Sequence, residues 1–80
     1  MPRVTGKTLD NTNRPIENAT ITIPSAGLFA LTDEQGNFVI ENVPPGTVTL
    51  FVVHRNFQKF GADLRIIEDM DVSLELDRSA

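Results

Sequence analysis

The chain has 80 residues, no cysteine, and a net charge of −4 from 7 basic and 11 acidic side chains. This length predicts one domain over residues 1–80, and the lack of cysteine excludes disulfides, thiolate metal sites and cysteine nucleophiles. The acidic balance argues against nonspecific nucleic-acid binding. The longest purely apolar run, Leu50 to Val53, is far shorter than the roughly 18 residues that a membrane span needs, so no membrane insertion is expected. The opening MPRVTGK has no apolar signal-peptide core, and the compartment stays unknown.

Period-two alternation predicts about seven short strands separated by turns rich in Gly, Pro, Asn and Asp. The segment RNFQKFGADL is the best candidate helix, but it is short and contains Gly61, so we expect a loop with at most a single helical turn. Short strands with turns about every 8–12 residues are typical of an antiparallel β-sandwich. In chain order the strands are expected at residues 3–9, 19–23, 28–32, 37–43, 48–53, 63–67 and 71–77.

The alternation also assigns side chains to the core, because successive residues of a strand point to opposite faces. The segment DVSLELD has the cleanest pattern, with its acidic residues and serine outward. The expected inward residues are Ala19, Ile21, Ile23, Phe38, Ile40, Val43, Val48, Leu50, Val52, Val72, Leu74 and Leu76.

The segment LTDEQGNFVIENVPPG admits two interpretations, a calcium loop or two turns around a strand. A calcium site would use Asp33, Glu34 and Asn37 as ligands, but the glycine is misplaced for a helical calcium loop and no bidentate glutamate follows at the required distance. The turn hypothesis is favoured: Asp33 accepts backbone N–H bonds and Gly36 supplies positive φ. Pro45 and Gly46 fit a type II turn, with proline first and glycine at the positive-φ position.

Catalytic residues, cofactors and metal ligands are not predicted. His54 is the only histidine, so neither a catalytic triad nor a histidine-rich zinc site can be assigned. It continues the inward set of its strand, and the simplest interpretation is a histidine at the edge of the core.

Large apolar side chains exceed what one small core needs. Two interpretations stay open: they cap the open ends of the sandwich, or they form an exposed patch for a protein partner, a neighbouring domain or self-association. Phe57 and Phe60 are expected in a loop beside several cations. The candidate patch consists of Leu28, Phe29, Leu31, Phe51, Val53, Phe57 and Phe60.

The ordered set of segments resembles the carboxypeptidase regulatory-like domain family over residues 3–77. VTGKTLDNTNRPIENATITI resembles its opening strand, turn and second strand, TDEQGNFVIENVPPGTVTLFV its hairpin and Pro-Gly turn, and DVSLEL its last strand. The chain departs from the family in the bulky residues 28–31, which are often small there. It also has Asn56 where the family often has glycine before an aromatic residue.

The resemblance implies an all-β, antiparallel Greek-key β-sandwich with transthyretin-like topology. It also implies a non-catalytic module that spaces, stabilises or docks a larger protein, commonly an exported or envelope-associated one. In the metallocarboxypeptidases of this family, zinc and the catalytic acid belong to a separate domain. The alternative function is a small ligand-binding module that takes a carbohydrate or calcium through its turn loops.

Overall fold

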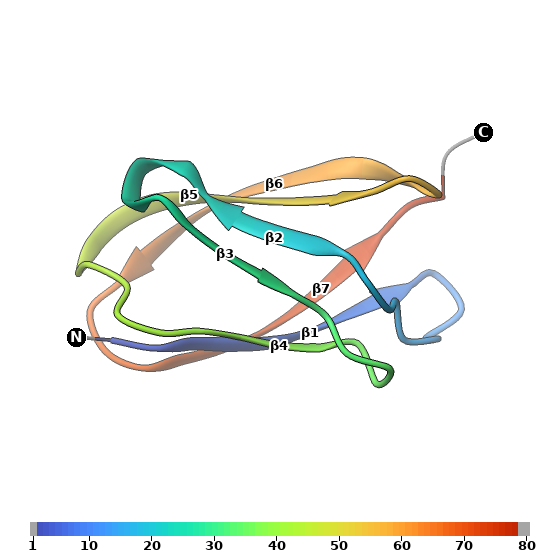
Figure 1. Ribbon diagram of the computed structural model, residues 1–80, viewed down its shortest axis with the longest axis horizontal. Helices are drawn as coiled ribbons and strands as arrows, with labels where there is room; N and C mark the ends of the chain where they lie inside the picture. The colour runs from blue at the N-terminus through green and yellow to red at the C-terminus, as the bar shows by residue number, and fades with distance from the viewer. Residues whose placement is uncertain (1, 79–80) are drawn as a thin grey trace.

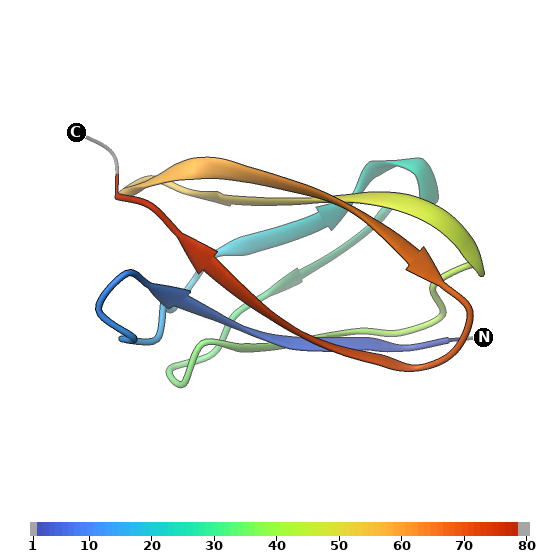
Figure 2. The same ribbon diagram turned by 180° about the vertical axis from the view of Figure 1, so that it is seen from behind.

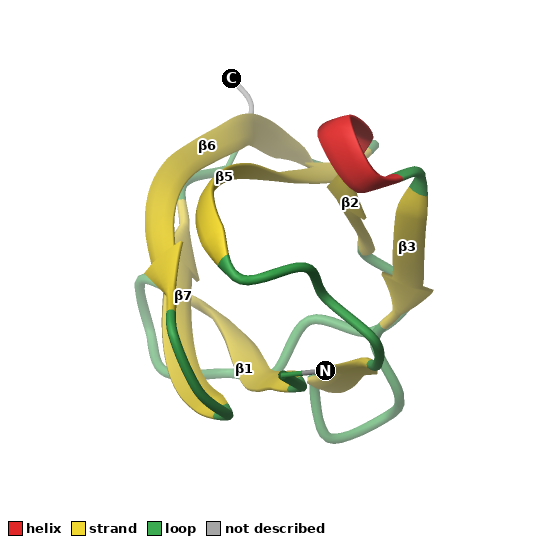
Figure 3. Ribbon diagram, turned by 90° about the vertical axis from the view of Figure 1, so that its left-hand side faces the viewer, coloured by secondary structure: helices red, strands yellow, loops and turns green. Residues whose placement is uncertain are grey.

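The computed structural model describes residues 2–78 as two packed β-sheets (Figure 1). Three strands form one sheet in the order β4-β1-β7, and four form the other in the order β3-β2-β5-β6. The end-on view shows the two sheets as facing layers, so the expected all-β sandwich of seven strands is confirmed (Figure 3). The elements are β1 (Val4–Asp10), β2 (Thr20–Ile23), η1 (Pro24–Ala26, a 3-10 helix), β3 (Leu28–Leu31), β4 (Asn37–Ile40), β5 (Gly46–His54), β6 (Phe57–Ile66) and β7 (Met70–Leu76).

One strand pair departs from the antiparallel arrangement. β1 and β7 run parallel in a register that places Val4 opposite Met70 and Asp10 opposite Leu76. Parallel neighbours need a long crossover, and here almost the whole chain lies between the two strands. Figure 2 shows β7 beside β1, with the two ends of the chain on opposite sides of the molecule. The first and last strands therefore hold each other in place in one sheet.

The core lies between the sheets and is built from the inward positions of the strands. The predicted inward residues are confirmed as buried, except Val72, which is half-buried. Val72 lies on β7, an edge strand, opposite Gly6, which has no side chain to cover it. The core also contains residues that the sequence did not assign to it: Val4, Ile16, Phe57 and Ile66.

The loop expected around Phe57 and Phe60 is wrong, whereas the strand expected at residues 63–67 is present as the second half of β6. Residues 57–66 form β6, a ten-residue strand that pairs antiparallel with β5 from Ile66 opposite Gly46 to Phe57 opposite His54. Its two phenylalanines, leucine and isoleucine are interspersed with charged residues, glycine and alanine, which lower its β-propensity. The pairing with β5 imposes the strand, because β5 is rich in Val and Thr and pairs with β6 along its length except for a bulge between Val52 and His54.

Two buried threonines fix the segment between β1 and β2. Thr32 Oγ1 donates to the carbonyl of Ile16 at 2.6 Å and accepts the N–H of Ala19 at 2.9 Å. Thr8 Oγ1 lies 3.1 Å from the same Ile16 carbonyl and 3.3 Å from that of Gly36. Both hydroxyls are almost fully buried, so these bonds satisfy groups that water does not reach.

Asp10 organises the turn that follows β1. Its Oδ1 accepts the hydroxyl of Thr12 at 2.7 Å, the N–H of Thr12 at 2.8 Å and the N–H of Arg14 at 3.0 Å. These bonds, the Thr12 hydroxyl first, hold the pKa of Asp10 below its ordinary value; burial opposes them, and Arg78 nearby adds to the lowering. A charged carboxylate therefore closes this loop.

Candidate interaction surface

The side of the four-stranded sheet that faces away from the core carries two apolar rows. Directly opposite residues of neighbouring strands point to the same face, so the register places Phe29 beside Thr22 and Thr22 beside Phe51. The second row runs from Leu31 through Thr20 to Val53. We call these six residues, from β3, β2 and β5, the outer apolar face.

Three side chains of this face are well exposed: Phe29 at 70%, Leu31 at 57% and Val53 at 48%. They lie outward because β3 and β5 alternate, with Ala30 and Val52 turned to the core side. The face therefore exposes bulky groups on adjacent strands.

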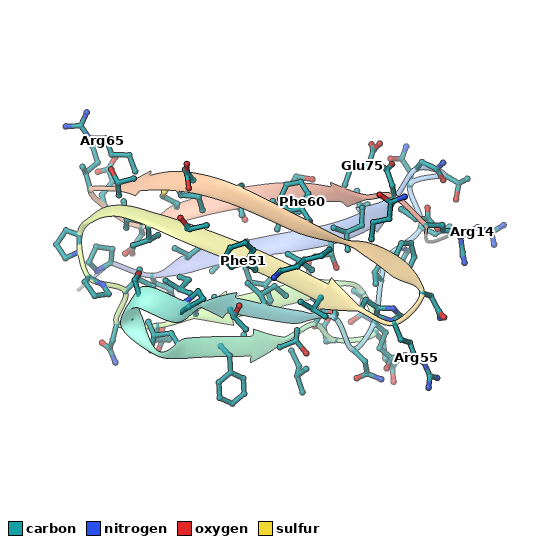
Figure 4. The ribbon with its side chains drawn as sticks, turned by 90° about the horizontal axis from the view of Figure 1, so that it is seen from above. Arg14, Phe51, Arg55, Phe60, Arg65 and Glu75 are labelled. Carbon is teal, nitrogen blue, oxygen red and sulfur yellow. The ribbon has the colours of Figure 1, made fainter. Side chains whose placement is uncertain are left out.

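Phe51 covers a glycine on the neighbouring strand. Its ring lies over Gly61, its cross-strand partner, where a Cβ would come within 3.0 Å of Phe51 Cε1. The Lys59 ammonium lies 4.6 Å from the centre of the same ring. Figure 4 shows Phe51 over the face formed by β5 and β6. Phe51 is consequently half-buried and lies between the apolar rows and the charged outer side of β6. On that side the Thr49 hydroxyl donates a hydrogen bond to Asp63 Oδ1 at 2.8 Å.

Three of the seven candidate patch residues lie elsewhere. Phe57 is only 7% exposed and belongs to the core, with the His54 ring 5.2 Å away in an edge contact and the Arg78 guanidinium 5.1 Å from its ring centre. Phe60 and Leu28 are half-buried and pack against the core. Their inclusion in an exposed patch is wrong, because β6 is a strand and because Leu28 points opposite to Phe29.

Two exposed apolar residues were not in the candidate set. Val39 is 52% exposed on β4, in the other sheet, and Ile67 is 71% exposed just after β6. Val39 alternates with the buried Phe38 and Ile40, a signal that the sequence contains. Neither residue lies on the outer apolar face, so both serve as reference positions for experiments.

The acidic segment after β3 forms a turn closed by Asp33. Its Oδ1 accepts the N–H groups of Gln35 and Asn37, both at 2.9 Å, and its carbonyl accepts the N–H of Gly36 at 2.9 Å. Gly36 has φ +78°, and a Cβ there would lie 2.6 Å from the carbonyl oxygen of Thr8. Glycine is thus required both for backbone conformation and for close approach. In residues 2–78 no group of three or more His, Asp or Glu side chains is placed to hold a metal ion.

The segment before β5 bends without a hydrogen-bonded turn. Gly46 has φ +127° and is the first residue of β5, opposite Ile66. The described backbone hydrogen bonds include none that closes a turn at Pro45. The two prolines therefore lead into the strand, and glycine supplies the positive φ.

His54 ends β5 beside a polar hollow that is lined by residues 53–56 and by Glu17, Asn18 and Thr20. Asn56 donates its N–H to Nδ1 at 3.1 Å, so the neutral ring carries its proton on Nε2, which lies 3.1 Å from the Glu17 carbonyl. Both ring nitrogens are thus engaged by backbone groups. The positive-φ residues other than glycine in the described part of the chain are Asn13, Asn18 and Asn42, so the β5–β6 turn does not use a left-handed Asn56.

Residues 2–78 contain no helix that is long and apolar enough to cross a membrane. Solved structures with the same fold include a chain of a type II cohesin–X-dockerin complex from Acetivibrio cellulolyticus, with a TM-score of 0.85 and 20% identity. That match covers 95% of this chain and 57% of the other, so this chain spans little more than half of its length.

Two further structures share the fold. The Bacillus anthracis TIE protein has a TM-score of 0.70 at 10% identity, over 96% of this chain and 16% of that one. The C-terminal domain of the Caf1A usher has a TM-score of 0.62 at 11% identity, over 98% and 99%. Likeness at these identities establishes the fold alone. No curated protein matches the chain significantly.

The sequence matches the carboxypeptidase regulatory-like domain over residues 3–77, which is nearly the whole chain. The two-sheet sandwich, the Asp33 turn and the Pro-Gly entry to β5 occur in the order that the resemblance led us to expect. This chain belongs to the carboxypeptidase regulatory-like domain family.

Proposed function

We propose that this domain is a non-catalytic interaction module that docks a partner protein or a neighbouring domain through the outer apolar face. The observation that carries the proposal is the exposure of Phe29 and Leu31, at 70% and 57%, on the same face as Val53. Apolar surface bordered by charged residues is typical of protein contact sites. Here the border is β6, with Lys59, Asp63 and Arg65 outward.

The area available is large enough to matter for binding. A phenylalanine side chain buries roughly 150–250 Å², and each Å² removed from water is worth about 25 cal/mol. Covering the exposed 70% of Phe29 is then worth about 3 kcal/mol, from which the entropy lost on association must be subtracted. Phe29 is therefore the residue expected to dominate the contact.

The frame beneath the face suits a rigid docking module. The core residues behind it, Ile21, Ile23 and Val52, are fully buried and hold β2 and β5 in register. The sandwich extends 35 Å along its long axis, with the chain ends on opposite sides (Figure 1). That geometry also suits a spacer between neighbours in a longer polypeptide.

Proteins of the same fold support the proposal at a coarse level. One of them was solved within a type II cohesin–X-dockerin complex, with mutations at its interface. Hydrophobic clusters on the surface of the Caf1A usher C-terminal domain are important for F1 antigen assembly. The outer apolar face would be the corresponding kind of surface here.

The test begins with a photoreactive phenylalanine analogue at position 29, with the same analogue at position 67 as reference, in the organism that makes the protein. We expect a protein adduct from position 29 that position 67 does not give. The adduct partner is then purified and titrated against the double variant Phe29→Glu/Leu31→Lys and the control Val39→Glu/Ile67→Lys. Both variants keep the net charge and replace exposed residues. Equal crosslinking from both positions would contradict docking through this face.

A further inference from the structure

The four edge strands of the two sheets are not equally protected. An edge strand exposes unpaired backbone N–H and C=O groups, and proteins usually guard such edges with charges or by covering them. β6 carries Lys59, Asp63 and Arg65 outward, and β7 carries Asp71 and Glu75. The two strands are also tied together at one end, where the N–H of Gln58 donates to the carbonyl of Asp77 at 2.7 Å. The edges of β6 and β7 are therefore protected against pairing with another strand.

The edge of β4 is occupied in part by its own turn. Asn37 donates its N–H to Asp33 Oδ1 at 2.9 Å, and its carbonyl accepts the N–H of Asp33 at 3.0 Å. Both backbone groups of Asn37 are thereby used. An incoming strand would find little of β4 to pair with.

β3 has neither charged side chains nor an edge occupied by its own turn. Its sequence, LFAL, contains no charged residue, and among the strands of residues 2–78 it pairs only with β2. Thr32, the next residue along the chain, donates its N–H to the carbonyl of Ala19 at 3.0 Å. Thr32 and Ala19 are therefore a hydrogen-bonded pair, and such pairs alternate with non-bonded pairs along antiparallel strands. Two residues before Thr32, Ala30 is bonded to β2, whereas Phe29 and Leu31 are not. The N–H and C=O groups of Phe29 and Leu31 therefore point to the free edge.

We propose that β3 pairs antiparallel with β3 of a second copy of this chain, across a twofold axis at Ala30. In that register Phe29 of one copy lies opposite Leu31 of the other, and Ala30 lies opposite itself. Both requirements of a sheet are then met: the outward side chains stay on one face, and the free backbone groups of Phe29 and Leu31 bond each other. The result is one continuous eight-stranded sheet.

Charge permits this approach although each copy carries −4. Asp33 lies three residues from the axis and would face Gly27 of the other copy. The two Asp33 side chains would be about 20 Å apart along the strands, given roughly 3.3 Å per residue. That distance is about twice the screening length at physiological salt, roughly 8–10 Å, so their repulsion is weak.

The pairing also explains why bulky residues occupy β3. Phe29 and Leu31, largely exposed in one copy, would pack across the new strand pair and extend the outer apolar face over both copies. A four-residue strand makes a small interface, below the roughly 1,000 Å² of stable complexes, so the dimer is expected to be weak and concentration-dependent.

Sedimentation equilibrium from about 10 μM to 1 mM tests the proposal, in the range expected of weak interfaces. The weight-average mass should rise from 8.8 kDa toward twice that value. Leu31→Pro removes an edge N–H while keeping an apolar side chain, and should stay monomeric. Val39→Pro, the matched change on the edge of β4, should associate like the wild type. A wild type that remains monomeric throughout, or a Leu31→Pro variant that associates equally, overturns the proposal.

Amide hydrogen exchange of the wild type gives a readout that needs no variant. Raising the protein concentration should slow the exchange of the Phe29 and Leu31 amides in proportion to the fraction of chains that are dimeric. The rate for Ala30 should not change, since its N–H is already bonded to β2. Association without protection of these two amides would also overturn the pairing. Docking of another protein is tested separately. We expect it to be lost in Phe29→Glu/Leu31→Lys and to survive in Leu31→Pro, which keeps an apolar side chain at position 31.

Discussion

Gly6 is a position where a single added methyl group should destabilise the sandwich, although its backbone needs no positive φ. It lies on β1 between β4 and β7, opposite Phe38 on one side and Val72 on the other. A Cβ at this position would lie 2.6 Å from Phe38 Cζ and 2.6 Å from the carbonyl oxygen of Val72. Real Cβ atoms essentially never approach other atoms this closely. The Phe38 ring can shift at some cost, but the Val72 carbonyl belongs to the backbone of β7.

The magnitude for Gly6→Ala follows from two opposed effects. Overpacking a core costs about 1–3 kcal/mol, and a clash with backbone places the cost in the upper half of that range. Replacing a strand glycine by alanine returns roughly 0.5–1 kcal/mol. The net loss in free energy of unfolding is therefore about 1–2.5 kcal/mol, which lowers Tm by roughly 4–20 °C in a domain of this size.

Gly61→Ala is the matched control, because Gly61 is also a strand glycine without positive φ. Its Cβ would approach only the ring of Phe51, at 3.0 and 3.2 Å, and that half-exposed ring can move. We expect the control to stay within about 0.5 kcal/mol of the wild type. Urea unfolding followed by circular dichroism measures both variants. Equal stability of Gly6→Ala and wild type, or equal losses in the two variants, would refute the packing argument.

Asp10→Asn tests the turn after β1. A lowered pKa stabilises the fold fully above the unfolded pKa, about 3.9, and this contribution is lost as pH falls through the folded pKa. The difference in free energy of unfolding between wild type and Asp10→Asn should therefore shrink in acid, and a constant difference in urea titrations would contradict the carboxylate's role. Thr32→Val leaves the buried N–H of Ala19 without its acceptor and should cost about 1–3 kcal/mol in the same assay. Thr22→Val, on the outer face, should be nearly neutral, and a similar loss there would count against the buried hydroxyl.

The sequence predicts the core of the sandwich well where alternation is strict. Ile21 and Ile23, and likewise Leu74 and Leu76, alternate with polar residues and are buried as expected. Burying one face of a strand is a local requirement, so the local pattern contains it.

The first half of β6 and the parallel pair of β1 with β7 lie beyond such reasoning. Residues 57–62 mix polar residues, glycine and alanine with phenylalanine, and they become a strand because β5 lies alongside them. Phe57 enters the core for the same reason. Which strands neighbour each other is a property of the whole chain, set by contacts between distant residues.

The candidate surface was predictable in part. Phe29, Leu31 and Val53 follow from alternation within their own strands, and all three are exposed. Their arrangement in neighbouring rows depends on the order β3-β2-β5, which alternation does not contain. The free edge of β3 could not be predicted from the sequence either, since it depends on which strand lies at the end of the sheet.

The most direct test of the proposed docking is the Kd of the purified crosslinked partner for three proteins: the wild type, Phe29→Glu/Leu31→Lys, and Val39→Glu/Ile67→Lys. Titration calorimetry should give at least a tenfold weaker Kd for the first variant, equivalent to a loss of about 1.4 kcal/mol, and an unchanged value for the second. Circular dichroism confirms that both variants stay folded. If the two variants bind the partner equally well, the outer apolar face is not the docking surface.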